Sequence, residues 1–244
     1  MNLIIDIGNS RAKAAVVDNG TVLRSYVVDS IDGEWLETLL NEHPSIQHAI
    51  LCSTRGDEKR VYQLLRASIA HVICFAPATT PTPLAIHYHT PATLGADRLA
   101  ASVGASELYP DCDLMIVDFG TAITIDFVED GAFKGGNISP GVTTRFRALA
   151  DYTAKLPLCY ATDEVLEYGR TTKEAIEQGV MRGVENEIRG YCEAFMQKKR
   201  KKCIIFTGGD AKYFAKRIKN TIFADCELVI LGLSRILDYN AEKI

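Results

Sequence analysis

Residues 3–10 of the chain have the sequence LIIDIGNS, and residues 115–122 repeat its pattern as MIVDFGTA. Each copy is an apolar run that ends in Asp-x-Gly and a small polar residue. A second strand-like run follows each copy and ends in a tight-turn dipeptide, Asn19-Gly20 in one case and Asp130-Gly131 in the other. Both dipeptides favour hairpins because they tolerate positive φ. The repeat predicts two related halves that face one another, with room for a phosphate chain between them.

Composition limits the classes of function. The chain has 244 residues, of which 47% are hydrophobic, so each of two domains can bury a sizeable core. A net charge of −4 gives no general attraction to nucleic acid or membranes, and we expect neither as a partner. The basic run at 198–202 stands between a helical pattern and an apolar run, which indicates a solvated helix end.

The cysteines and the N-terminus indicate the compartment. There are seven cysteines, an odd number without a C-x-x-C pair, which is typical of reduced thiols in a cytosolic protein. Asp6 interrupts the first apolar stretch, so this stretch does not resemble a signal peptide. No apolar stretch approaches the roughly 20 residues that span a bilayer. We expect a soluble, cytoplasmic protein.

The order of predicted elements divides the chain near Pro110, into domains at 1–112 and 113–244. Three strands are expected within 2–28 and three more at 114–119, 122–128 and 132–136. The remaining predicted elements are helices at about 33–42, 57–69, 95–109, 172–197 and 231–240, strands at 48–52 and 71–75, and a loop at 135–141. This order favours two α/β domains with mixed sheets over one doubly wound sheet.

The turn at residues 6–13 carries the first candidate site. Gly8 lets the backbone approach a phosphate, Asn9 and Ser10 can donate to its oxygens, and Lys13 adds a positive charge. Asp6 would be repelled by a phosphate, so we expect it to act through magnesium or its water shell. The alternative is an ordinary hairpin in which Asp6 stabilises the turn.

The second copy of the motif supplies Asp118 and Thr121. Asp118 follows an apolar run and should lie at the carboxyl end of a strand, where it could bind a cation. Thr121 could donate a hydrogen bond to a phosphate oxygen. The alternative role for Asp118 is to cap the turn. Taken together, the two copies indicate a nucleotide-dependent phosphotransferase.

Gly95-Ala96-Asp97-Arg98 places opposite charges beside a glycine at a predicted helix start. Asp97 could accept the proton of a substrate hydroxyl, the usual role of a base in phosphoryl transfer. Arg98 could bind a planar carboxylate through two parallel hydrogen bonds. The alternative is that Asp97 complements the helix dipole while Arg98 is solvated. Further on, Thr207-Gly208-Gly209 between a strand and a helix suits backbone contact with an adenosine.

With these residues in place, the chain resembles the type III pantothenate kinases of the acetate kinase, sugar kinase, Hsp70 and actin superfamily. The resemblance covers essentially the whole chain. Its motifs occur in the family's order: Asp6-x-Gly8-Asn9-Ser10 with Lys13, residues 95–98, Asp118-x-Gly120-Thr121-Ala122, residues 136–141, and residues 207–209. Ser10 stands where the family usually has threonine, and Thr171 where asparagine is common.

The resemblance implies a fold and a set of roles. The fold would be two duplicated actin-like (ribonuclease H-like) domains with mixed five-stranded sheets flanked by helices and a cleft between them. ATP, with magnesium, would bind at Asp6, Ile7, Gly8, Asn9, Ser10, Arg11, Ala12, Lys13 and Thr121. Pantothenate would bind at Tyr88, Gly95, Ala96, Asp97, Arg98 and Thr172, with Asp97 as proton acceptor.

The resemblance also implies a cation and an assembly. Asp118 would hold a monovalent cation, potassium or ammonium. The family is homodimeric, and Gly179, Gly183 and Gly190 on the helix at 172–197 would permit close helix approach, unless they only ease packing within one chain. The implied reaction is ATP-dependent phosphorylation of pantothenate, the first step toward coenzyme A. Two alternatives stay open: a nucleotide-binding regulatory protein of the same fold, and a kinase for another small hydroxy acid.

Overall fold

A computed structural model describes residues 1–9, 11–197, 200–219, 221–223 and 227–241. The chain forms two compact units. Unit 1 comprises Met1–Pro110, Gly131–Lys134 and Cys226–Ile244, and unit 2 comprises Asp111–Asp130 and Gly135–Asp225. Across the described residues, no helix combines the length and the apolar character that crossing a bilayer requires.

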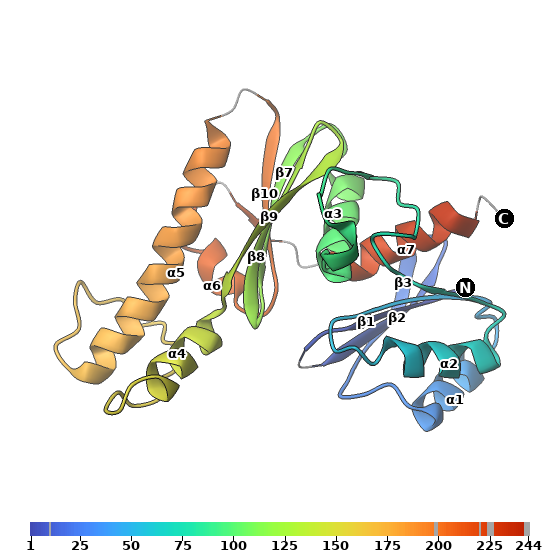
Figure 1. Ribbon diagram of the computed structural model, residues 1–244, viewed down its shortest axis with the longest axis horizontal. Coiled ribbons are helices and arrows are strands. Elements are labelled where there is room, and N and C mark those ends of the chain that lie inside the picture. The colour runs from blue at the N-terminus through green and yellow to red at the C-terminus, as the bar shows by residue number, and fades with distance from the viewer. Residues whose placement is uncertain (10, 198–199, 220, 224–226, 242–244) are drawn as a thin grey trace. The chain divides into compact units, whose positions relative to one another are not determined.

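Unit 1 is built on a five-stranded mixed sheet in the order β3-β2-β1-β4-β5. The antiparallel strands are β1 (Asn2–Ile7), β2 (Ala12–Asp18) and β3 (Thr21–Val28), and the strands parallel to β1 are β4 (His48–Ser53) and β5 (His71–Cys74). Helices α1 (Gly33–Glu42) and α2 (Glu58–Ser68) cover one face of this sheet, while α3 (Ala96–Leu108) and α7 (Leu228–Ala241) cover the other (Figure 1). Unit 1 also contains β6 (Ala85–Ile86) and the 3-10 turn Pro91–Thr93.

Unit 2 repeats this plan. Its strands are β7 (Asp113–Phe119), β8 (Ala122–Glu129), β10 (Lys202–Thr207), β11 (Ile222–Phe223) and the part of β9 (Ala132–Pro140) from Gly135 onward, since Ala132–Lys134 belong to unit 1. One face of the sheet packs against α4 (Val142–Asp151), α5 (Thr172–Met196) and α6 (Ala211–Ala215) around a core that includes Phe119, Phe146, Phe206 and Phe214. Phe119 stacks on Phe214 with ring centroids 4.8 Å apart.

The two sheets confirm the duplication that the sequence predicts. The second sheet has the order β11-β10-β7-β8-β9-β6, so its first five strands repeat the order of the first sheet. The hairpin turns match as well: Asn19 and Gly20 have φ of 47° and 76°, and Asp130 and Gly131 have φ of 55° and 67°. Positive φ at both central residues defines the hairpin turn that Asn-Gly and Asp-Gly favour.

Two local features differ from the sequence-based expectation. The second sheet has a sixth strand, the two-residue β6, which pairs with Ala132 and Phe133 at the start of β9. Strand β9 also runs on to Pro140, so residues 135–140 are strand where a loop was expected. Gly135, Gly136 and Pro140 lower the strand propensity of this segment, and pairing across the sheet overrides it.

Alternation along β1 separates the core from a polar face. Leu3, Ile5 and Ile7 point into the core shared with α1 and α2. Asp6 has the opposite orientation because successive side chains of a strand point to opposite faces. The Asp6 side chain therefore lies on the side of the sheet that α3 and α7 cover.

Helices α3 and α7 pack at the distance of backbone contact. A Cβ at Gly232 would lie 1.8 Å from Ala100 O, and a Cβ at Gly104 would lie 2.3 Å from Leu228 O. Only glycine fits at such positions. This contact explains why the C-terminal helix clusters with unit 1, whereas the sequence-based division placed all of 113–244 in the second domain.

We expect Gly232→Ala to destabilise unit 1. The added methyl group would overlap the α3 backbone, which cannot move aside as a flexible side chain can. Overpacking of this kind typically lowers the free energy of unfolding by about 1–3 kcal/mol. Denaturant unfolding measures the change, with Gly33→Ala as control because a Cβ there meets nothing within 4 Å. Equal losses in both variants would contradict the proposed backbone contact.

Candidate active site

The turn after β1 is held by its own backbone. Gly8 N donates to Arg11 O over 3.1 Å, which closes the turn between β1 and β2. The side chains of Ile7 and Ala12 are buried, so these two residues can offer a ligand only their backbone groups. Asn9 and Arg11 are exposed, and Ser10 lies outside the described residues. The structure thus places an exposed loop of backbone amides and small polar groups at the end of β1.

Two residues after β4 fix this turn from the side, and the sequence did not single them out. Thr54 N donates to Ile7 O over 2.9 Å. Arg55 Nε donates to Asn9 O over 3.1 Å, and its Nη1 donates to Asp29 O over 3.0 Å. Arg55 is therefore a second cation at the turn besides Lys13. The signal in the sequence was an arginine two residues after a buried strand.

Three side chains form a row across neighbouring strands. Asp6 on β1 is in register with Lys13 on β2 and with Cys52 on β4. Residues in register point to the same face of a sheet. Lys13 Nζ also lies 3.1 Å from Glu227 Oε1, just before α7. The row is thus polar and borders the face that α3 and α7 cover.

The helix start at Gly95 is shaped around Asp97. Asp97 Oδ1 accepts a hydrogen bond from Arg98 N over 2.9 Å. A Cβ at Gly95 would lie 2.6 Å from the same oxygen, so a larger residue there would force the Asp97 carboxylate to shift. Asp97 is half-buried in the first turn of α3. The contact with the helix amide agrees with the dipole role considered above and leaves Oδ2 for a second role.

Arg98 and Tyr88 belong to the same unit. Arg98 is only 7% exposed, which rules out the alternative that it is a solvated surface residue. Its backbone oxygen accepts from Ser102 Oγ over 2.9 Å. Tyr88 is half-buried, with its ring centroid 6.0 Å from that of Phe133.

Cys52 connects the turn with the helix start. It is 1% exposed, and its Sγ donates to Asp6 Oδ1 over 3.5 Å. Burial raises the pKa of the Cys52 thiol well above its usual range, and the carboxylates of Asp6 and Asp97 add to the effect. Asp6 and Asp97, far apart in sequence, therefore lie near one another within unit 1.

Asp118 is the next-to-last residue of β7 in unit 2, in register with Thr207 on β10 and Thr124 on β8. Glycines surround its carboxylate. A Cβ at Gly208, whose φ is 93°, would lie 2.4 Å from Asp118 Oδ1, and one at Gly120 would lie 3.6 Å from it. The backbones of these glycines thus approach closely a carboxylate at the carboxyl end of a strand.

The turn that carries Thr121 is fixed by the start of α4. Thr121 O accepts from Gly141 N over 3.0 Å and from Thr144 Oγ1 over 2.7 Å. A Cβ at Gly141 would lie 2.1 Å from Gly120 O, so glycine is required for this approach. The Thr121 side chain itself is exposed. Its position in the turn is set by the backbone, and its hydroxyl is accessible to a ligand.

Thr172 is exposed at the first position of α5, behind a capped helix start. Thr171 Oγ1 accepts from Glu174 N over 3.2 Å. Glu174 Oε2 accepts from Arg170 N over 2.7 Å, one residue earlier than in a standard capping box. Thr171 and Glu174 therefore form a slightly shifted capping box.

The described residues suit magnesium and a monovalent cation in different ways. Among the described residues, no three His, Cys, Asp or Glu side chains cluster as metal ligands. Magnesium usually keeps several waters and binds through one or two carboxylates plus substrate phosphates, so it needs no such cluster. Oxygen donors suit a monovalent cation, and Asp118 supplies a carboxylate that the backbone of Gly208 approaches closely.

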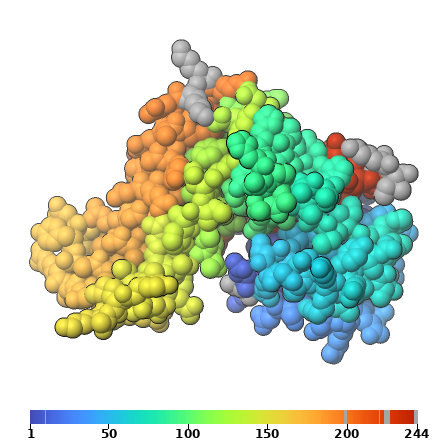
Figure 2. All heavy atoms as spheres, in the orientation of Figure 1, coloured from blue at the N-terminus to red at the C-terminus, as the bar shows by residue number. Residues whose placement is uncertain are grey.

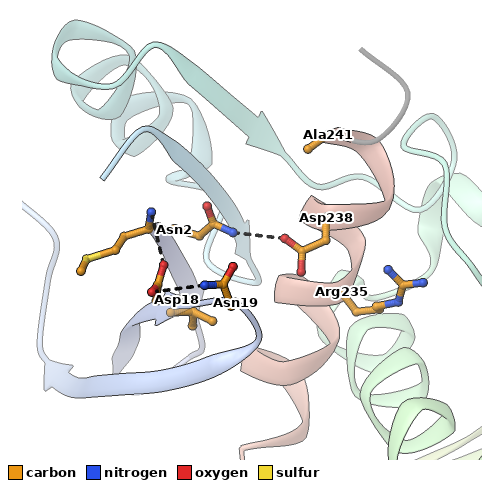
Figure 3. A pocket seen from close by; sticks show the side chains of 8 residues that line it. Asn2, Asp18, Asn19, Arg235, Asp238 and Ala241 are labelled. Carbon is orange, nitrogen blue, oxygen red and sulfur yellow. Dashed lines mark hydrogen bonds and ion pairs between the residues drawn. The ribbon is translucent and has the colours of Figure 1, made fainter. Parts of the chain in front are cut away.

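A pocket of about 490 Å³ in unit 1 contains none of these residues (Figure 3). It lies at the other end of β1 and β2, lined by Met1, Asn2, Val17, Asp18, Asn19, Arg235, Asp238 and Ala241. Asn2 Nδ2 donates to Asp238 Oδ1 over 3.2 Å, and the N-terminal amine lies 3.8 Å from Asp18 Oδ1. The candidate residues of unit 1 thus lie at the opposite end of β1, not in this pocket.

Solved structures place the fold in a known class. A Campylobacter jejuni protein named for the Baf family of transcriptional activators has a TM-score of 0.64 and 22% identity, covering 98% of this chain and 99% of that one. The ROK hexokinase of Thermus thermophilus has a TM-score of 0.50 and 12% identity, covering 98% and 99%. The chain therefore has the two-unit α/β fold that is also found in ROK sugar kinases.

Sequence comparison defines the family within this class. The family model for type III pantothenate kinase matches residues 2–194. The type III pantothenate kinase of Phocaeicola vulgatus is 43% identical over 242 residues, which cover 98% of this chain and 99% of that protein. The chain belongs to the type III pantothenate kinase family, which confirms the resemblance seen in its motifs.

Proposed function

We propose that this chain transfers the γ-phosphoryl group of ATP to the primary hydroxyl of pantothenate, the first step of coenzyme A biosynthesis. Family membership supports the reaction class and the substrate. The observation that carries the proposal furthest is the helix start at Gly95. There a carboxylate and a buried guanidinium stand on adjacent residues, and pantothenate offers a hydroxyl to the first and a carboxylate to the second.

Unit 1 would supply the base and most of the phosphate contacts. Asn9 and Ser10 would donate to phosphate oxygens that Gly8 lets approach the backbone, and Lys13 and Arg55 would balance the phosphate charge. Asp97 would accept the proton of the pantothenate hydroxyl as its oxygen attacks phosphorus. Arg98 would bind the pantothenate carboxylate through parallel hydrogen bonds. Gly95, Ala96, Tyr88 and Thr172 would complete the pantothenate contacts.

Cations would assist from two places. Magnesium would arrive with ATP, bound by its phosphates, with Asp6 contacting the water shell of the ion. Asp118 would hold potassium or ammonium beside the phosphates, where the positive charge offsets that of the nucleotide. Thr121 would donate its hydroxyl to a phosphate oxygen. Bound cations of this kind neutralise charge that develops on the transferred group.

We expect activity to depend on a monovalent cation through Asp118. Replacing potassium by sodium or a bulky organic cation, at constant ionic strength, should lower the wild-type rate about tenfold, the effect of losing one ionic contact. Asp118→Ala should show the low rate in every salt. Initial rates in matched chloride salts measure this, with Asp151→Ala, an exposed acid of unit 2, as control. Equal wild-type rates in all salts would rule out the cation role.

The assembly would be a homodimer in the cytoplasm. A Cβ at Gly179, Gly183 or Gly190 of α5 meets nothing within 4 Å, so these glycines do not serve packing within the described chain. The preceding segment, at 152–171, exposes large side chains at the surface of unit 2 (Figure 2), among them Tyr152, Leu158, Tyr160, Val165 and Tyr168. Several large exposed side chains within one segment are typical of protein interfaces.

A panel of acceptors tests the proposal. Pantothenate, other small hydroxy acids and sugars are incubated with ATP, magnesium and potassium, and phosphorylated products are measured by mass spectrometry. We expect pantothenate to be the preferred acceptor by kcat/KM. A different preferred hydroxy acid would reassign the substrate. ATP binding without transfer to any acceptor would favour the regulatory alternative.

A further inference from the structure

Cys52 occupies a position that the roles above leave unexplained. It lies in register with Asp6, and both side chains point to the face of the sheet opposite the α1 and α2 core. Its thiol is 1% exposed and donates to Asp6 Oδ1 over 3.5 Å. A buried thiol could equally have packed as a small apolar group, as free cysteines commonly do.

The carboxylates around Cys52 indicate a role for its thiol. The carboxylates of Asp6 and Asp97 both lie close enough to act on it electrostatically. Like charges in a partly buried site repel one another, and the repulsion strengthens as water is excluded. A neutral donor beside two carboxylates gives one of them a directional contact without adding a charge. Asp6 therefore lies between the side chains of Lys13 on β2 and Cys52 on β4.

We propose that Cys52 is a positioning residue, whose thiol holds the Asp6 carboxylate in one orientation beside the phosphate-binding turn. The backbone of that turn is already fixed, because Thr54 N binds Ile7 O and Arg55 Nε binds Asn9 O. The Asp6 side chain is the group that must face the water shell of the nucleotide-bound cation, and Cys52 Sγ is one of the groups in contact with it. This inference rests on the proposed role of residues 6–13 in ATP binding.

A double-mutant cycle tests the contact between Cys52 and Asp6. We expect Cys52→Ala to lower kcat/KM for ATP about 2- to 10-fold, the usual effect of one hydrogen bond. KM for pantothenate should not change. Cys52→Ser, which keeps a donor, should stay within about twofold of the wild type. In the Asp6→Asn background, Cys52→Ala should have little further effect, because the two positions act through one contact.

Cys74→Ala is the matched control. Cys74 lies on the next strand, β5, in register with Leu51, and packs against the α1 and α2 core on the other face of the sheet, so its thiol does not form a row with Asp6. We expect it to leave kcat/KM for ATP unchanged. Should Cys52→Ala prove too unstable to assay, Cys52→Ser and Cys52→Val give the same comparison of a donor with a group of similar size that cannot donate.

The outcomes distinguish failure of the Cys52 inference from failure of the proposed kinase function. A wild-type rate for Cys52→Ala would overturn the inference. So would the same loss in the wild-type and Asp6→Asn backgrounds, which would mean that Cys52 serves packing alone. If the wild type phosphorylates no acceptor, the proposed function fails instead. The same cycle is then measured on ATP affinity by calorimetry, where coupling between the two positions supports the inference and additivity overturns it.

Discussion

Asp97→Asn should abolish most turnover while leaving the fold intact. A positioned base typically contributes about 10²- to 10⁴-fold to the rate, and asparagine cannot take a proton from the substrate hydroxyl. The fold should survive because the asparagine oxygen can still accept the hydrogen bond from Arg98 N, and Gly95 leaves the same room for it. Steady-state kcat with pantothenate and ATP measures the effect, and thermal unfolding confirms that the variant is folded.

The control for Asp97→Asn is the same substitution of charge at an acid that interacts only with a helix dipole. Glu34 lies in the first turn of α1, and Glu34→Gln removes the same charge from a helix start. A charge at this position contributes typically about 0.3–1 kcal/mol to stability. We expect Glu34→Gln to leave kcat unchanged. If Asp97→Asn also keeps a near wild-type kcat, Asp97 is a helix-dipole partner and not the base.

Arg98→Lys should raise KM for pantothenate far more than it lowers kcat. Lysine keeps the positive charge but loses the planar fork that binds a carboxylate through two hydrogen bonds. Loss of one charge-assisted hydrogen bond corresponds to about 1.5–3 kcal/mol, or roughly ten- to a hundredfold in affinity. Asp97 keeps its place in this variant because its contact is with the backbone of residue 98.

A pantothenate analogue with a neutral amide in place of the carboxylate is the control for this effect. The amide cannot form the charge-assisted pair, so the substitution should affect its KM much less. The comparison also removes any general effect of replacing a side chain that is only 7% exposed. If KM rises equally for the acid and the amide, Arg98 does not bind the carboxylate.

The fold was largely predictable because its signals are local. Tight-turn dipeptides with positive φ, such as Asn19-Gly20, mark the hairpins, and α1 begins and ends at the residues that its apolar spacing predicts. The position of α7 was not predictable in this way. Its place on unit 1 depends on Gly104 and Gly232, which let two helices touch across a long sequence separation and leave no periodic signal.

The residues of the candidate site also fall into two groups, those predictable from local sequence and those that depend on tertiary contacts. Residue types within one turn, such as Asp6 with Gly8 or Asp97 with Arg98, could be assigned roles from their chemistry. Contacts that depend on strand register could not: Cys52 meets Asp6 only because β4 pairs in parallel with β1. Arg55 reaches Asn9 for the same reason, since the end of β4 lies beside the end of β1. Register between parallel strands is a tertiary property that a single sequence does not display.

Product identification tests the central claim most directly. Purified protein is incubated with pantothenate, ATP, magnesium and potassium, and the product is examined by phosphorus NMR and mass spectrometry against ATP consumption. The account predicts one pantothenate phosphorylated on its primary hydroxyl for each ATP consumed, and loss of this product in Asp97→Asn. Hydrolysis of ATP with pantothenate left unmodified, or phosphorylation of its carboxylate, would contradict it.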